Sequence, residues 1–397
     1  MRFLLSLITS LVFLTSCSKE VIIFPSTDCF WRDLSTEHSR HDDYQNLLND
    51  FHSRGIPGVT VLIAKADEDI WVSSAGLAEL ESGQPLAPCH IMPVGDISQL
   101  FCAAACMLMI EDGILNLESK IQNFLPDDYV MNIPNSKTAT IAQLLSHTSG
   151  IPDYSDNSDF SLEMLNNKNM DFNREIILEK YLMGQAAKFS PGTEYGYSAS
   201  NYELLTLIMD QVYSKGHASF YSFRLIRRLG LNRSFYKNET DYFSLHSNSM
   251  ANGYYDRMSD GKLENATDLS ISMASGQTGS HGVVSNVVDL YMFLKALMEA
   301  ELISESSLDL MKDYTKEPEN LSNIKYGLGL EFRQHDIYGT AIGHGGRSSG
   351  FTSEAWYYPE QNAYLIYCIN AGTITNGPVK RLIDEDFREA ILSKLFN

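Results

Sequence analysis

The sequence has few basic residues for its length. Lysine and arginine number 30 against 50 aspartates and glutamates, which gives a formal net charge of −20 over 397 residues. No basic stripe is present that could neutralise a run of phosphates, so nucleic acid is not expected as a partner. Low-complexity tracts, internal repeats and long runs of like charge are also missing. With 44% hydrophobic and 11% aromatic residues, the composition indicates a soluble globular protein with a large core.

The sequence also lacks the spacings that common metal sites require. No C-x-x-C pair occurs and the 10 histidines form no H-x-x-x-H cluster, so neither a metal nor another cofactor is expected. Cys102 and Cys106 lie four positions apart among apolar neighbours, which favours buried thiols over a bridge. The sequence leaves open whether Cys29 and Cys89 form a disulfide.

No stretch near the N-terminus is long enough to cross a membrane. The segment MRFLLSLITSLVFLTSCSKE begins with a basic residue and continues with about a dozen apolar ones, which is typical of an export signal. Leu14-Thr15-Ser16-Cys17 resembles a bacterial lipobox, in which the cysteine receives a diacylglycerol and becomes the mature N-terminus. An ordinary signal peptide with an incidental cysteine is the alternative.

This segment predicts the location and the domain plan. Residues 1–16 are expected to be a signal peptide, 17–40 a linker lipid-anchored through Cys17, and 41–397 the folded domain. We therefore expect a protein of the bacterial cell envelope, exported to the periplasm or the cell surface and held on a membrane.

The first part of the domain changes from a strand pattern to a helix pattern. A helix is expected over 41–54, and two β-rich runs around the acidic turn KADED predict a hairpin within 58–80. From residue 98, apolar residues recur at helical spacing and end before Gly113, which predicts a buried helix of about 14 residues.

The remaining pattern returns from helices to strands. Helices are expected to begin near Asn201 and to cover 281–297, the latter capped by Ser285. Strands follow in YGLGLEFRQ, TAIGHGG and TSEAWYYPEQNAYLIYCIN, before a closing helix near 378–395. This order predicts one sheet from about 55–95 and 320–397, interrupted by a helical region of about 98–300.

Six segments carry a resemblance to a known family. They are ESGQPLAPCHIMPVGDISQLF, IAQLLSHTSGIPDY, PGTEYGYSASNYELL, GVVSNVVDLYMFL, YGLGLEF and GHGGRSSGFTSEAWYYPE. Their order and spacing resemble the serine β-lactamase and penicillin-binding protein superfamily over about residues 55–395, nearest to its class C-like branch, which includes esterases and D-aminopeptidases. The resemblance implies an α/β fold of the β-lactamase/transpeptidase type, a mainly antiparallel sheet flanked by helices with an all-helical subdomain inserted.

The resemblance implies a serine nucleophile and a lysine three residues later on one helix, and both are replaced here. Aligned by VG before and F after, Asp96 stands at the serine position and Gln99 at the lysine position. In the second motif, Tyr-x-Asn, Tyr197 is kept but Ala199 stands at the asparagine position, which holds the substrate in the family.

The third motif is kept. His344, Gly345 and Gly346 lie on a strand that the resemblance places along the site, where it would offer a backbone N–H to an oxyanion. For Tyr197 and His344, the sequence leaves open whether the side chain serves packing or a ligand. For Arg347, directly after the glycines, the sequence leaves two roles open. Its side chain either contacts a ligand carboxylate or is exposed and only solvated.

No other serine replaces the missing nucleophile. Ser98 lies about 200° round the helix from Asp96, and Phe101 stands where its lysine would be. Ser322 and Lys325 match S-x-x-K in a loop without a buried helix, which indicates a chance match. His147, in LLSHTSG, is expected to brace a loop, and residues 356–358 to belong to the sheet core.

A carboxylate near a helix N-terminus suits the fold but stops acyl transfer. We therefore expect a membrane-anchored, catalytically disabled relative that retains a pocket for a peptidoglycan-derived peptide or a similar small acyl ligand. Two alternatives stay open. One is an active hydrolase of the β-lactamase, carboxypeptidase or esterase kind that uses Asp96, Tyr197 and water, and the other is an envelope scaffold without a ligand.

Overall fold

The computed structural model describes residues 35–167, 173–236, 249–313 and 323–396. The predicted signal peptide, the predicted lipidation at Cys17, most of the predicted linker and Ser322 therefore lie outside the described residues. Among the described residues, no helix has the length and apolar character needed to cross a membrane.

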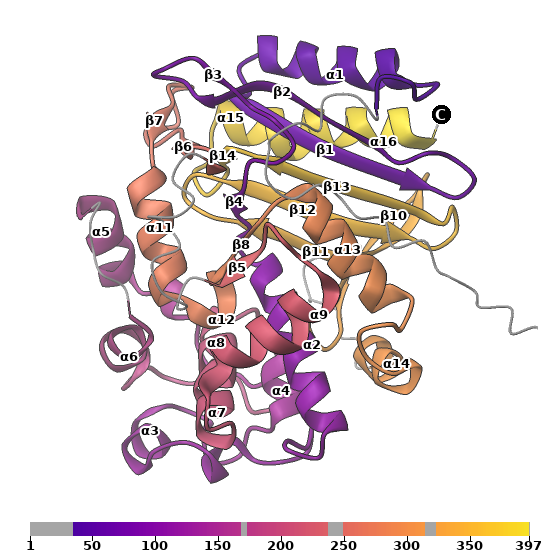
Figure 1. Ribbon diagram of the computed structural model, residues 1–397. Coiled ribbons are helices and arrows are strands. Elements are labelled where there is room, and N and C mark those ends of the chain that lie inside the picture. The colour runs from indigo at the N-terminus through magenta and orange to yellow at the C-terminus, as the bar shows by residue number, and fades with distance from the viewer. Residues whose placement is uncertain (1–34, 168–172, 237–248, 314–322, 397) are drawn as a thin grey trace, which may run out of the picture.

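An eight-stranded antiparallel sheet forms the centre of the fold (Figure 1). Its order is β3-β2-β1-β13-β12-β11-β10-β9, so strands from the two ends of the domain meet where β1 pairs with β13, with Val61 opposite Tyr367. The strands are β1 (Gly58–Lys65), β2 (Trp71–Glu79), β3 (Gln84–Pro85), β9 (Ile324–Tyr326), β10 (Glu331–His335), β11 (Gly339–Arg347), β12 (Thr352–Tyr358) and β13 (Ala363–Ile369). The expected hairpin and the expected sheet from both ends are confirmed.

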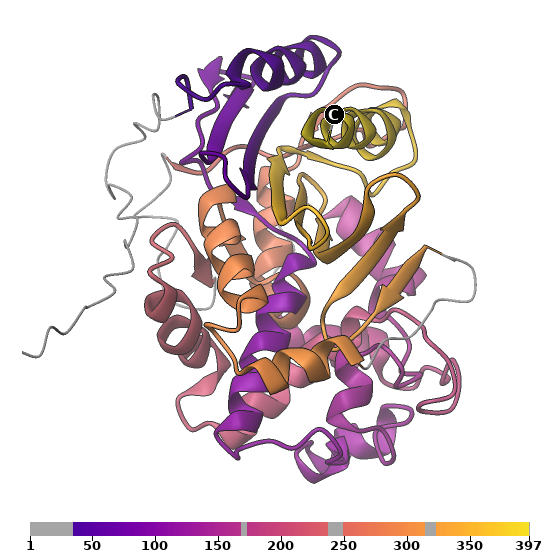
Figure 2. The same ribbon diagram turned by 90° about the vertical axis from the view of Figure 1, so that its right-hand side faces the viewer.

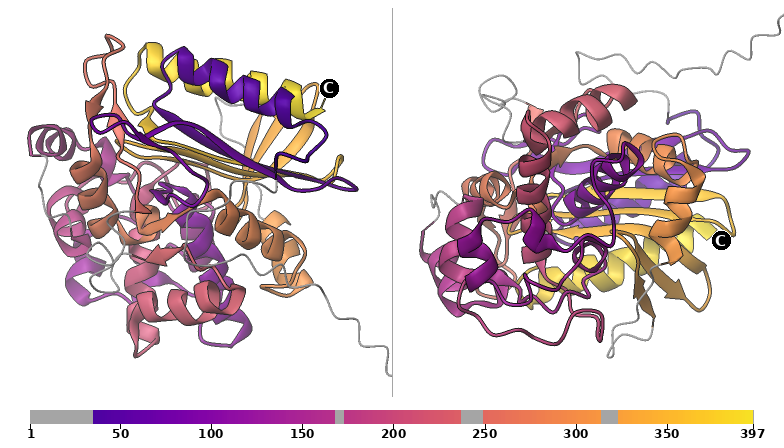
Figure 3. Two further views of the ribbon diagram at one scale, coloured as in Figure 1. Left: turned by 45° about the horizontal axis from the view of Figure 1, so that its top comes forward. Right: turned by 90° about the horizontal axis from the view of Figure 1, so that it is seen from below.

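Helices cover both faces of the sheet. On one face lie α1 (His41–Ser53) and a C-terminal helix built from α15 (Pro378–Arg381), a π-helical stretch (Leu382–Phe387) and α16 (Arg388–Phe396), side by side in Figures 1 and 3. Their apolar side chains pack on the sheet in a core that includes Trp71 and Phe387. A larger core on the other face includes α2 (Ile97–Glu111) and α13 (Val287–Met298). The expected mixed α/β architecture, an antiparallel sheet flanked by helices, is confirmed.

The region between the two halves of the sheet is mainly helical. It contains α3 (Asp127–Asn132), α4 (Ile141–Leu145), α5 (Ser158–Asn166), α6 (Arg174–Ile177), α7 (Ala199–Val212), α8 (Gly216–Tyr221), α9 (Arg227–Leu229), α11 (Thr267–Gly276), α12 (Thr278–His281) and α14 (Glu305–Asp313). Two small three-stranded sheets accompany these helices, made of β4 (Met92–Pro93), β5 (Phe235–Tyr236), β6 (Tyr254–Tyr255), β7 (Glu264–Asn265), β8 (Val283–Ser285) and β14 (Ala371–Gly372).

Helix α2 connects the sheet to the helical region (Figure 2). No charged residue occurs between Asp96 and Glu111, and all residues from Ile97 to Met109 are buried. A helix that is apolar on every side can only be stable inside the protein, so the predicted buried helix is confirmed. Cys102 and Cys106 are free buried thiols on it, as expected.

Two predicted elements differ from the structure. The helix expected over 281–297 begins only at Val287 and is capped by the Asn286 side chain rather than by Ser285, because Val283–Ser285 form β8 and pair with β4 and β5. The strand expected in YGLGLEFRQ is broken between β9 and β10. Gly329 has φ 76° there, and a Cβ on it would lie 2.2 Å from the Ala103 Cβ of α2. The chain therefore bends over the helix, where only glycine fits.

Candidate functional site

Two glycines let the start of α2 approach strand β11. Gly95 has φ 57°, and a Cβ on it would lie 2.6 Å from the backbone nitrogen of Arg347. Across the contact, a Cβ on Gly346 would lie 1.9 Å from the Val94 carbonyl oxygen. Since neither position tolerates a side chain, the two backbones touch, and Asp96 at the beginning of α2 faces the end of β11.

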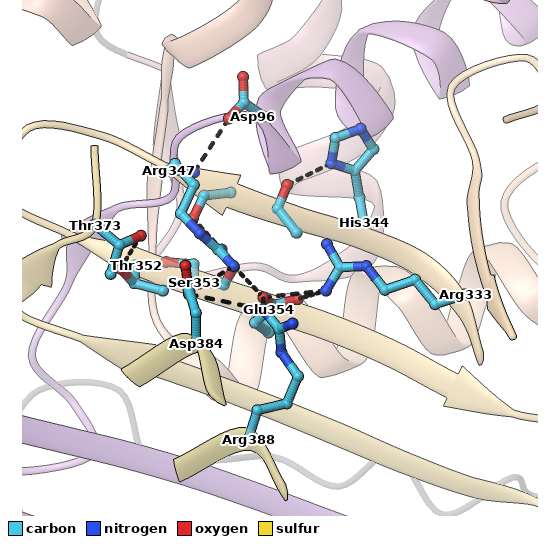
Figure 4. A network of polar contacts seen from close by, with 12 residues as sticks. Asp96, Arg333, His344, Arg347, Thr352, Ser353, Glu354, Thr373, Asp384 and Arg388 are labelled. Carbon is cyan, nitrogen blue, oxygen red and sulfur yellow. Dashed lines mark hydrogen bonds and ion pairs between the residues drawn. The ribbon is translucent and has the colours of Figure 1, made fainter. Parts of the chain in front are cut away.

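The Asp96 carboxylate accepts hydrogen bonds from three elements. The Tyr197 hydroxyl donates to Oδ1 over 2.6 Å, and the Gln99 Nε2 group donates to the same oxygen over 3.2 Å. The Arg347 N–H donates to Oδ2 over 3.1 Å (Figure 4). A backbone N–H aimed at the residue in the nucleophile position is the kind of donor that stabilises an oxyanion. Here that donor already gives its hydrogen bond to the protein's own Asp96 carboxylate.

Gln99 lies one helical turn below Asp96 and is completely buried. Its Nε2 group donates to the Tyr197 hydroxyl over 2.6 Å, and its Oε1 atom lies 3.2 Å from His147 Nε2. The imidazole Nδ1 faces two donors, the Ser198 N–H and the Asn201 amide, so His147 carries its proton on Nε2 and donates to Gln99. The hydrogen bonds therefore run in one direction, from His147 through Gln99 and Tyr197 to Asp96.

Tyr197 is held as a neutral phenol. Its side chain is 36% exposed, but its hydroxyl lies between Asp96 and Gln99. The desolvated position of the hydroxyl, and then the negative charge of Asp96, raise the pKa of Tyr197 well above 10. A phenol in this setting keeps its proton, donates a hydrogen bond to Asp96 and does not act as a base near neutral pH.

Two further polar residues close the inner side of the network. Tyr326 is buried and its hydroxyl lies 2.9 Å from His344 Nε2 and 3.4 Å from Gln99 Oε1. His344 is also buried, and its Nδ1 contacts the Gly345 carbonyl oxygen over 2.6 Å. Burial, and then the nearby His344, lower the pKa of His147 to about 3, so its imidazole is neutral.

The structure brings Asp96, Gln99, Tyr197 and His344 together but leaves Ala199 apart. Ala199 is the first residue of α7, only 3% exposed, and it packs in an apolar cluster with residues such as Tyr154 and Phe160. It therefore does not face a ligand. Ser98 is equally unsuited to the role of nucleophile, because it is 1% exposed and its Oγ accepts the Val283 N–H over 3.1 Å.

The sequence reasoning missed His281 as a member of the site. Its Nε2 lies 3.8 Å from Asp96 Oδ1 and 3.1 Å from the Arg347 carbonyl oxygen, while its Nδ1 lies 2.9 Å from Ser280 Oγ. Helix α12 carries His281 and is fixed by the buried Glu203 carboxylate, which accepts hydrogen bonds from the Ser280 N–H and hydroxyl. No motif in the sequence marked His281. His147, expected only to brace a loop, belongs to this network as well, and no motif marked Tyr326 either.

Arg347 turns its guanidinium away from Asp96, so it has neither of the two roles considered from the sequence. The guanidinium contacts the fully buried Glu354 over 2.6 Å and Asp384 over 3.1 Å (Figure 4). Arg333 and Arg388 contact the same Glu354 carboxylate over 3.0 and 3.1 Å. These three cations hold the pKa of Glu354 well below its ordinary value despite the burial that opposes this shift.

The described residues contain no group of three or more histidine, cysteine, aspartate or glutamate side chains placed to hold a metal ion. Among the described residues, the groups that donate hydrogen bonds to Asp96 are the Tyr197 hydroxyl, the Gln99 amide and the Arg347 N–H, and neither a serine hydroxyl nor a lysine amine is among them.

Comparison with known proteins agrees with this fold. The family model described as Beta-lactamase matches residues 40–384. The chain is 27% identical over 320 residues to penicillin-binding protein 4* of Bacillus subtilis (strain 168), which covers 78% of this chain and 67% of that protein. It is 27% identical over 201 residues to protein flp of Staphylococcus aureus (strain MW2), which covers 50% of this chain and only 39% of that protein.

Two solved structures have the same fold. The D-amino acid amidase from Ochrobactrum anthropi SV3, complexed with L-phenylalanine, superimposes with a TM-score of 0.77 at 22% identity and covers 88% of this chain and 97% of that one. The penicillin-binding protein from Bacillus halodurans superimposes with a TM-score of 0.70 at 22% identity and covers 88% of this chain and 98% of that one. At this level of identity the likeness concerns the fold.

Proposed function

We propose, from the premise that the chain belongs to the Beta-lactamase family, that it is a catalytically silent member that binds a cell-wall peptide or a similar acyl ligand instead of transferring an acyl group. The observation that carries the proposal is the placement of Asp96. Its carboxylate stands at the family's nucleophile position and accepts the Arg347 N–H, the donor on which an acyl oxygen would depend.

The nucleophile and its base are both replaced. Gln99, at the lysine position, has an amide that accepts no proton near neutral pH, and it is already bonded to Asp96 and Tyr197. In a serine hydrolase, removal of the nucleophile alone costs about six decades of rate. Neither a neutral Tyr197 nor a neutral His147 offsets such a loss.

Binding is supported by what the network preserves. The donors and acceptors around Asp96 are paired, and they are fixed by elements from four parts of the chain, α2, the segment before α7, α12 and β11. Such a rigid arrangement has little entropy to lose when a ligand arrives. The 36% exposed Tyr197 ring and the 18% exposed Asp96 side chain leave the network open to solvent on one side.

We place this protein in the cell envelope, held by a lipid on Cys17. The signal-like segment 1–16 supports export. The disulfide-bonded state of Cys89 supports an oxidising compartment. Incorporation of a clickable palmitate analogue that disappears in Cys17→Ala would support the anchor, and equal labelling of both proteins would contradict it.

A covalent probe tests the silent state. Purified protein treated with a fluorophosphonate or a labelled penicillin should gain no mass, because none of the described groups that hydrogen-bond to Asp96 is a serine hydroxyl. A stoichiometric adduct on any residue contradicts the proposal. Ester or peptide hydrolysis that vanishes in Asp96→Asn would favour the alternative in which Asp96 and water act directly.

Binding needs its own measurement. Muropeptides added to the protein should raise its melting temperature with the logarithm of their concentration above the dissociation constant, because a ligand that binds only the folded state stabilises it. If saturating muropeptides leave the melting temperature of the folded protein unchanged, the role of a scaffold without a ligand is favoured instead.

A further inference from the structure

The charge of Asp96 has no fixed positive partner in the described part of the chain. All three of its hydrogen-bond donors, the Tyr197 hydroxyl, the Gln99 amide and the Arg347 N–H, are neutral groups. Neutral donors solvate a carboxylate but leave its negative charge in place. The site therefore presents a carboxylate whose three hydrogen-bond donors carry no charge.

The nearest guanidinium is used elsewhere. The backbone N–H of Arg347 donates a hydrogen bond to Asp96. Its side chain points to the opposite side of the sheet, where Glu354 and Asp384 bind it (Figure 4). Arg333 and Arg388 are held by the same Glu354 carboxylate. Arg333 also pairs with Glu331, so each of the three guanidiniums is bound by carboxylates of this cluster and none of them contacts the Asp96 carboxylate.

His281 is the one basic side chain that the described residues place within 4.0 Å of Asp96. Its Nε2 is 3.8 Å from the carboxylate but 3.1 Å from the Arg347 carbonyl oxygen, so its hydrogen bond goes to the carbonyl. Its Nδ1 is engaged with Ser280. The imidazole thus braces the backbone next to Asp96 and leaves the exposed side of the carboxylate free.

A partly exposed tyrosine stands beside this carboxylate. Tyr197 has its hydroxyl on Asp96, and 36% of its side chain is exposed. The face of a phenol ring attracts cations, and a carboxylate next to it adds a charge-assisted hydrogen bond. Together they form a surface that favours a positive group and disfavours a negative one.

We infer that the site holds its ligand through a primary ammonium group, with Asp96 as the counter-ion and the Tyr197 ring beside it. This inference rests on the proposed binding function and specifies which end of a peptide enters. The free amino end of the peptide faces Asp96, and a carboxylate end is rejected by like charge.

Three matched dipeptides test the inference by calorimetry in low salt. D-Alanyl-D-alanine amide is cationic at about pH 6.5, where an α-amino group keeps its proton. Its N-acetyl derivative is neutral, and N-acetyl-D-alanyl-D-alanine is anionic. The cationic ligand should bind about tenfold more tightly than the neutral one, and the anionic ligand most weakly. Added salt should narrow the differences, because it screens partly exposed charges.

A variant and a matched control isolate the charge. Asp96→Asn keeps the shape and should bring the cationic and neutral ligands to within about threefold of each other. Asp336→Asn removes one exposed acid at the turn between β10 and β11, and it should leave the order of the three ligands unchanged. Melting curves establish that each variant is folded.

The outcomes separate the two proposals. If the wild-type protein binds the neutral or the anionic dipeptide as tightly as the cationic one, the ammonium inference is wrong and the binding function stands. If Asp96→Asn keeps the full preference for the cation, another group supplies it and the inference is again wrong. If none of the three dipeptides binds the folded wild-type protein, the binding function itself is overturned together with the inference.

Discussion

The double variant Asp96→Ser/Gln99→Lys should regain acyl transfer. Serine at position 96 has no carboxylate to occupy the Arg347 N–H, which then becomes available to an acyl oxygen. The Gln99 Nε2 atom lies 2.6 Å from the Tyr197 hydroxyl and 3.2 Å from Asp96 Oδ1, so a lysine amine, one bond longer, reaches both positions. Burial of that amine lowers its pKa and makes it a base.

The magnitude follows from the parts restored and those still missing. A nucleophile is worth about six decades of rate, and one oxyanion donor about two to three. Since Ala199 remains buried and cannot clamp a substrate, we expect only partial recovery, of about three decades in p-nitrophenyl acetate hydrolysis over the parent protein.

The change also has a cost in stability. Lysine offers no acceptor to His147, whose buried Nε2–H now donates to Gln99 Oε1. An unsatisfied buried donor costs about 1–3 kcal/mol, so the variant should melt a few degrees below the parent. A lower melting temperature together with activity would therefore be the expected pair of results.

The assay combines turnover with mass spectrometry. A fluorophosphonate should add one adduct to the double variant, on the serine introduced at the start of α2, and none to the parent. Asp96→Ala/Gln99→Lys, which lacks only the nucleophile, is the control and should stay inactive. If the double variant is folded but neither hydrolyses the ester nor takes the label, the Arg347 N–H and Tyr197 are not aligned for catalysis, and the reasoning is refuted.

Three further predictions concern stability. Ala199→Asn should lower the free energy of unfolding by about 1–3 kcal/mol, because it places an amide in the apolar cluster around Tyr154, and an unchanged melting temperature would contradict that packing. Glu354→Ala removes a fully buried carboxylate that three partly buried arginines share, and it should cost about 3–5 kcal/mol in chemical denaturation. Asp386→Ala, at an exposed ion pair, should cost under about 1 kcal/mol, and equal losses would refute the account of the cluster. Burial raises the pKa of Asp289 to about 6, so the contribution of this carboxyl to stability is complete below about pH 4 and is lost as the pH rises through 6. Between these pH values, the free energy of unfolding of Asp289→Asn should rise by up to about 3 kcal/mol relative to that of the wild type. Parallel profiles of unfolding free energy against pH for the two proteins would contradict this.

The sequence predicted the elements whose signals are local. The hairpin around KADED, the apolar helix after Asp96 and the closing helix each have a periodic pattern within one segment, and each is present in the structure. The helix expected over 281–297 failed at its start, because Val283–Ser285 pair with strands from elsewhere in the chain. Strand pairing between distant segments overrides local helical periodicity.

By itself the sequence determined that an acid and an amide stand at Asp96 and Gln99, which the family resemblance predicts to be the two reactive positions, and it predicted Tyr197 and His344 as retained motif residues. Only the tertiary structure decided what the acid does. The N–H that binds Asp96 comes from a residue 251 positions away, and His281 and Tyr326 reach the site from two other segments. Hydrogen bonds and charge compensation depend on distances of a few ångströms between such segments, which are set when the sheet and α2 pack together.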